Sequence, residues 1–207
     1  MLACVPRLHG QYRTVFYILR RLRSIRRSLT RSVFQSIVVA GIIEAGLWEC
    51  NIGWLPLYQL RRLQSVMNAA ERLVFSASRY DQILPLLHRL HWLRAPQRIS
   101  FKLAVLAFRC LMGLALTYLS DSLRHVVDLP GRQRLRSASS ADLAVSQTRL
   151  QTVGDRAFCV AAAKTWNSLP SEVTSSVTLS TFKQKLKTYR FFTVISRHVI
   201  YPHIDVQ

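Results

Sequence analysis

The stretch from Gln59 to Leu93 constrains the fold most, because its apolar residues recur at the spacing of an α-helix. One face of the first half carries Leu60, Leu63, Met67, Ala70 and Val74, and this period predicts a helix. The other faces carry Arg61, Arg62, Gln64, Asn68, Glu71 and Arg72. Polar residues at 76–81 interrupt the pattern, and Pro85 opens a second helix that runs to Trp92. We therefore predict a helical hairpin with one apolar seam and a cationic outer surface.

The charge of the chain is unusual for a protein of 207 residues. It has 29 basic and 10 acidic residues, a formal net charge of +19, and all but five of the basic residues are arginine. Such an excess favours polyanionic partners, first nucleic acid and second an anionic membrane surface. Half of the residues are hydrophobic, so the chain is able to bury a core. The four cysteines lie far apart and predict reduced thiols instead of a disulfide framework.

The N-terminal segment combines this charge with a helical pattern. Residues 1–43 contain no acidic residue. Between Tyr12 and Leu29 an apolar stripe predicts an amphipathic helix, and the stripe consists of Val15, Ile18, Leu19, Leu22, Ile25 and Leu29. On the polar side of that helix we expect phosphate contacts from Arg20, Arg21, Arg23, Arg26 and Arg27. A mitochondrial transit peptide or a membrane-surface helix has the same pattern, so both remain alternatives.

Two apolar blocks raise the question of a membrane span. Val33–Leu47 is apolar only as far as Glu44, and Phe101–Leu119 includes Lys102 and Arg109. A charged residue near the middle of a span costs a few kcal/mol. We therefore predict buried helices of a soluble domain for both blocks, with the second helix beginning at Pro96 and ending at Gly113.

The C-terminal third predicts a different kind of structure. A basic run supplies three further candidate phosphate contacts, Arg132, Arg134 and Arg136. A solvated loop is the alternative interpretation of this run. Two short strands are predicted next, Leu143–Val145 and Arg149–Val153, which together make a small β-hairpin.

Helices are expected on both sides of that region. A short helix is predicted over Leu116–Val126. Asp155 is expected to cap a helix that continues to Trp166, and Ser180 to cap a last helix over Thr181–Phe192.

Several short motifs occur in a fixed order along the chain. The central motifs are Gln59–Val66, Asn68–Ala70, Tyr80–Asp81, Leu86–Leu87, Leu90–Leu93 and Phe101–Lys102. The others are Leu19–Leu29, Tyr118–Ser120, Arg134–Ser137, Gly154–Phe158, Trp166–Pro170 and Phe182–Lys187. This ordered set resembles the C-terminal region of reverse transcriptases from non-LTR retrotransposons of the jockey and chicken-repeat type. The resemblance covers about residues 16–189 and departs at Leu47–Asn51, where the family tends to have Leu-Asp-Tyr-Cys-Asn, and in the tail from Phe192.

The helical patterns and this resemblance together predict a mainly α-helical fold with four parts. These are a basic N-terminal helix at 1–32, a helical bundle like a polymerase thumb at 33–128, a region with a small β-hairpin and two helices at 129–192, and a divergent tail at 193–207. The resemblance also implies binding of RNA, single strands or RNA–DNA hybrid. Possible base-stacking platforms are Trp54, Tyr80 and Trp92, although aromatic residues spaced among leucines more often belong to a core.

Catalysis by this chain itself is not expected. Polymerisation needs paired carboxylates that hold two Mg²⁺ ions, and the sequence has no Asp-Asp pair. His88 and His91 have helical spacing but no third metal ligand at a suitable distance along the sequence. We therefore predict no cofactor, no metal site and no small-molecule substrate. A separate expectation is a location in the nucleus or cytoplasm. Two alternatives to nucleic-acid binding stay open, namely a translated remnant of an inactivated element and a basic membrane-associated protein.

Overall fold

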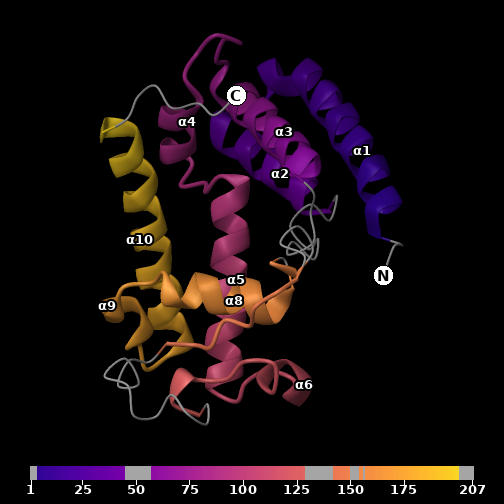
Figure 1. Cartoon of the computed structure of the whole chain (residues 1–207). Helices are drawn as coiled ribbons and strands as arrows, with labels where there is room; N and C mark the ends of the chain where they lie inside the picture. Colours follow the sequence, from indigo (N-terminus) through magenta and orange to yellow (C-terminus); the bar gives the residue numbers. More distant parts are fainter. Residues whose placement is uncertain (1–3, 45–56, 129–141, 150–153, 156, 201–207) are drawn as a thin grey trace. The chain divides into compact units, whose positions relative to one another are not determined.

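A computed structural model describes residues 4–44, 57–128, 142–149, 154–155 and 157–200 (Figure 1). The described residues are mainly helical, which confirms the predicted fold class. Contacts between residues divide the chain into two compact units, Met1–Ala95 and Pro96–Gln207. Each unit has a hydrophobic core of its own.

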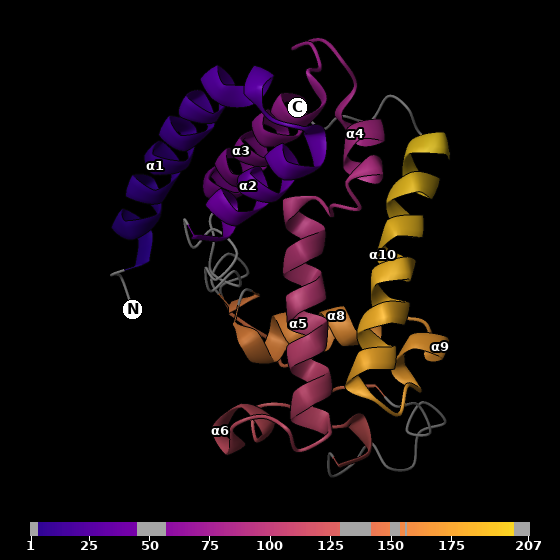
Figure 2. The same ribbon diagram turned by 180° about the vertical axis from the view of Figure 1, so that it is seen from behind.

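The first unit is a bundle of helices that pack side by side (Figure 2). Its elements are α1 Cys4–Ile25, the 3-10 turn η1 Arg26–Ser28, α2 Arg31–Glu44, α3 Leu57–Phe75 and α4 Ile83–Arg89. The core consists mainly of the predicted apolar stripes, with Val15, Leu19 and Leu22 from α1 packed on Leu63, Met67, Ala70 and Val74 from α3. Because burial of each such side chain stabilises the fold by roughly 1.5–3 kcal/mol, these two stripes fix α1 against α3.

The polar residues of α3 do not all lie on its outer surface. Glu71 is fully buried and Gln59 is nearly so, whereas the helical pattern had assigned Glu71 to the cationic outside. Two faces of α3 are covered, because α1 and α2 both pack against it. The simple division into an apolar seam and a solvated remainder is therefore wrong for Glu71.

The second unit is built from α5 Ala95–Leu111, α6 Thr117–Ser120, η3 Val126–Asp128, α8 Phe158–Asn167, α9 Ser171–Thr174 and α10 Leu179–Ile200. In both views α8 runs across α5, and α10 lies alongside α5 (Figures 1 and 2). The ring of Phe182 from α10 stacks on Phe108 of α5, with 4.4 Å between centroids, and on Trp166 of α8, with 5.9 Å. These three rings therefore join three helices at the centre of the core.

Gly113 ends α5 as predicted. Its φ is +67°, a value that glycine adopts without the steric cost of a Cβ atom. The amide of the next residue, Leu114, donates to the carbonyl of Arg109 at 2.8 Å. The short helix expected over Leu116–Val126 is interrupted, because only Thr117–Ser120 is α-helical and Val126–Asp128 is a 3-10 turn.

The predicted β-hairpin is not supported. Among the described residues Leu143 forms only an isolated antiparallel bridge with His125. On its other edge, the Asn167 side chain accepts from the Leu143 amide and donates to the Leu143 carbonyl, both at 2.9 Å. Both edges of the backbone at Leu143 are thus occupied, so no further strand can pair there. Residues 150–153, half of the expected hairpin, lie outside the described residues.

Two predicted helix caps are also wrong. Asp155 accepts a hydrogen bond from Thr148 Oγ1 at 3.1 Å and pairs with Lys164 Nζ at 3.0 Å, while α8 begins at Phe158 without a side-chain cap. The hydrogen bonds from Lys164 and Thr148 lower the pKa of Asp155. At α10 the amide of Thr181 donates to Thr178 Oγ1 at 3.3 Å. Thr178, two residues before Ser180, is therefore the cap.

Candidate nucleic-acid interface

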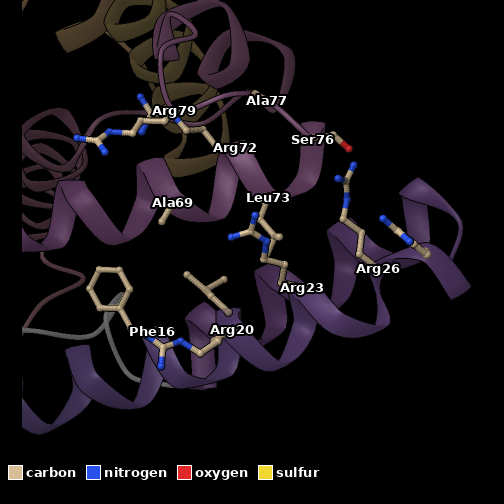
Figure 3. A pocket seen from close by; sticks show the side chains of 12 residues that line it. Phe16, Arg20, Arg23, Arg26, Ala69, Arg72, Leu73, Ser76, Ala77 and Arg79 are labelled. Carbon is tan, nitrogen blue, oxygen red and sulfur yellow. The ribbon is translucent and has the colours of Figure 1, made fainter.

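A groove of about 680 Å³ lies between α1 with η1 on one side and α3 with the turn after it on the other (Figure 3). Six of the described side chains that line it are arginines. They are Arg20, Arg23, Arg26, Arg27, Arg72 and Arg79. The remaining described lining residues are Phe16, Leu19, Ala69, Leu73, Ser76 and Ala77. The groove therefore combines a strong positive charge with apolar walls.

The helical repeat of α1 determines which arginines reach the groove. Arg20, Arg23 and Arg27 are spaced by three and four residues, so they share one side of the chain as it passes from α1 into η1. The buried Leu19 and Leu22 hold that side against α3. The three guanidinium groups thus remain at the border between the packed stripe and solvent.

Arg26 fixes the turn that closes this side of the groove. Its Nη2 donates to the carbonyl of Val74 at 3.3 Å, and its guanidinium lies 5.9 Å from the centre of the Phe34 ring. Val74 is in the last turn of α3, where carbonyl groups have no helical partner. Arg26 therefore ties η1 to the end of α3.

The α3 side contributes space as well as charge. Ala69, Ser76 and Ala77 have small side chains, which leave room between the arginines. Ser76 has a φ of +54°, and the Ala77 amide donates to the Arg72 carbonyl at 3.0 Å, so the chain turns sharply after α3. Nε of Arg72 is buried and has no hydrogen-bond partner in the described part of the chain.

A second recess of about 450 Å³ continues the cationic surface. It shares Arg26, Arg27 and Ser76 with the groove and adds Arg31 and Phe75. The ring of Phe75 has two cationic neighbours, the guanidinium of Arg31 at 4.1 Å and that of Arg89 at 5.1 Å. Such cation–π contacts hold guanidinium groups in place without neutralising their charge.

The groove arginines have no ionic partner among the described residues. None of the described side chains that line the groove or the recess is acidic. The ion pair of Lys164 with Asp155 belongs to the second unit. Several like charges around one groove raise the local potential and attract a polyanion.

The structure brings together four of the eight predicted phosphate contacts: Arg20, Arg23, Arg26 and Arg27. Arg21 is exposed elsewhere on α1, with its guanidinium 5.7 Å from the Tyr17 ring. Arg132, Arg134 and Arg136 lie outside the described residues.

The three predicted stacking platforms also differ in their exposure to solvent. Trp92 is buried in the core of the first unit, Trp54 lies outside the described residues, and Tyr80 is 88% exposed. Tyr80 is thus the one of the three that the structure shows to be accessible.

Sequence reasoning missed Arg72, Arg79 and Phe16 as lining residues. Arg72 was assigned to the outer surface of its helix, but nothing in the helical period says which neighbouring helix borders that surface. A usable signal did exist for Phe16, since it lies four residues before Arg20 and therefore on the same face of α1.

Other chemical groups do not assemble into a site in the described part of the chain. No three His, Cys, Asp or Glu side chains there form a group that is able to hold a metal ion. The rings of His88 and His91 are 6.3 Å apart. Burial raises the pKa of the Cys110 thiol, which keeps it in the weakly nucleophilic protonated form. No described helix is both long and apolar enough to cross a membrane.

Comparison of the chain with protein-family models, with curated protein sequences and with solved structures finds no match in any of the three.

Proposed function

We propose that the chain binds nucleic acid through the phosphate backbone, without sequence preference and without catalysis of its own. The observation that carries this proposal is the groove between α1 and α3, which six arginine side chains line and to which no described acidic side chain contributes. Phosphate is the anion that such planar, permanently charged donors bind in pairs of hydrogen bonds. The partners are RNA, a DNA single strand or an RNA–DNA hybrid.

The composition of the groove supports binding that ignores sequence. Specific readout of a base edge needs polar side chains that match its donors and acceptors. Apart from the arginines, the described lining residues offer only the hydroxyl group of Ser76 as a polar side chain. Contacts to phosphates position a nucleic acid but carry no sequence information.

We further propose that the chain is similar to the region that follows the polymerase core in retrotransposon-encoded RNA-directed DNA polymerases. The support is the ordered set of sequence motifs. Of these, Leu19–Leu29 contributes Leu19 and four arginines to one wall of the groove, and Asn68–Ala70 contributes Ala69 to the other. In this proposal the helical region at 33–128 is the thumb-like part. Binding then contributes to holding a template or a hybrid, while the catalytic carboxylates belong to another part of such a polymerase.

A salt series with a labelled single-stranded RNA tests the proposal. If all six groove arginines contact phosphates, the logarithm of the binding constant falls against the logarithm of salt concentration with a slope of about −4. Fluorescence anisotropy measures the binding constant, and circular dichroism establishes that the chain is folded. A folded chain that does not bind RNA at low salt refutes the proposal and favours a remnant without function. Binding that does not weaken with salt also refutes it.

A further inference from the structure

One exposed aromatic side chain lines the groove, and a second directly follows a lining residue along the chain. Phe16 lines the groove with 45% of its surface exposed. Tyr80 is 88% exposed and directly follows Arg79, which lines the groove. Neither ring is needed for a site that binds phosphate alone, because phosphate contacts come from the cationic side chains.

Phe16 is placed with the phosphate-binding groups and not apart from them. Figure 3 shows its ring beside Arg20 on the same side of α1, as the spacing of four residues requires. Its neighbour Leu19 is buried against α3, which anchors this turn of the helix. The ring therefore lies at the wall of the groove, with almost half of the residue's surface exposed.

Tyr80 is held by an ordered turn, not by a loose loop. The Ser78 amide donates to Asp81 Oδ2 at 2.6 Å, and the Asp81 amide donates back to the Ser78 carbonyl at 3.2 Å. The Tyr80 amide donates to Ser78 Oγ at 3.4 Å. In addition, the Arg79 guanidinium lies 5.9 Å from the centre of the Tyr80 ring. This turn presents the ring to solvent next to a cation.

From these positions we infer that the groove binds single-stranded nucleic acid, with bases stacked on Phe16 and Tyr80 while the arginines contact the phosphates. The inference rests on the proposed function and narrows it. In a duplex the bases are paired and stacked on one another, so their faces are not available to protein rings. A single strand offers those faces, and an aromatic platform accepts any base.

The test compares three probes: a labelled single-stranded RNA of about 12 nucleotides, the duplex of the same sequence, and inorganic polyphosphate as a competitor. The variant replaces both rings, F16L with Y80L. The matched control replaces two other exposed tyrosines of the first unit, Tyr17 of α1 and Tyr58 of α3, as Y17L with Y58L. Circular dichroism compares the folding of all variants.

We expect the F16L/Y80L variant to lose affinity for the single strand about five-fold or more for each ring. Its affinity for polyphosphate should stay within about two-fold of the original protein, because the cationic groups are unchanged. The Y17L/Y58L control should keep both affinities. Restoring aromatic rings, as F16Y with Y80F, should restore binding of the single strand.

Three results would overturn the inference while leaving phosphate binding intact. These are equal binding of duplex and single strand by the original protein, no loss in the F16L/Y80L variant, or an equal loss for the single strand and polyphosphate. Failure of the original protein to bind any of the three probes would instead refute the proposed function itself. The polyphosphate measurement therefore separates the two failures.

Discussion

The side-chain amide of Asn167 makes the hydrogen bonds to the Leu143 backbone that a neighbouring β-strand would otherwise make. It accepts a hydrogen bond from the amide of Leu143 and donates one to the same residue's carbonyl. Leu143 is 1% exposed, so these backbone groups have little access to water. The motif Trp166–Pro170 thus has two structural functions, since Trp166 packs in the core and Asn167 holds the chain at Leu143.

Replacing Asn167 by alanine should lower the free energy of unfolding by roughly 1–3 kcal/mol, because the Leu143 amide and carbonyl lose their partners. Urea unfolding measures this loss. S168A is the matched control, since the Ser168 hydroxyl donates only within its own helix end, to the Thr165 carbonyl at 2.7 Å. We expect S168A to change stability by less than about 0.5 kcal/mol. Equal effects of the two variants would contradict the role assigned to Asn167.

The positions at which helices begin and end depend on hydrogen bonds that the sequence only partly reveals. Ser180 and Thr178 are both residue types that cap helices, and the sequence favoured Ser180. The structure selects Thr178, whose carbonyl accepts from the Phe182 amide at 2.9 Å and whose hydroxyl accepts from Thr181. Starting α10 at Leu179 points Phe182 into the core, where it stacks on two other rings. Packing of Phe182 is consistent with this choice.

The T178A variant should therefore lose about 1 kcal/mol of stability, the usual effect of removing a side-chain cap. T178S keeps the hydroxyl and should retain most of that stability. The comparison is with S180A, which removes the residue that the sequence had favoured and should have an effect below about 0.5 kcal/mol. Thermal unfolding followed by circular dichroism measures all three. A larger loss in S180A than in T178A would show that the cap is Ser180.

The contrast between local sequence patterns and long-range packing also explains how much of the candidate site the sequence predicted. Helical periodicity identified α1, α3 and the apolar stripes that join them, and therefore four of the arginines in the groove. Periodicity does not say which face of one helix borders another, so Arg21 was included and Arg72 and Arg79 were not. The β-hairpin failed for a related reason, because the partner of Leu143 is a side chain 24 residues away. Such long-range pairs leave no local pattern.

For the whole molecule, the question is whether the groove or merely the net charge of +19 attracts nucleic acid. General attraction depends on total charge, whereas a site depends on where the charges lie. The first unit offers a comparison at constant charge. Arg23, Arg27 and Arg72 line the groove, while Arg21, Arg61 and Arg62 are exposed and are not among its lining residues.

The most direct measurement is therefore the salt dependence of RNA binding for two triple variants of equal charge, R23Q/R27Q/R72Q and R21Q/R61Q/R62Q. If the groove is the binding site, the groove variant should reduce the magnitude of the logarithmic salt slope by about 2, the loss of three phosphate contacts to a single strand. The control variant should keep nearly the original slope. Equal slopes and affinities for the two variants would show that net charge alone governs binding, which would contradict the groove as the site.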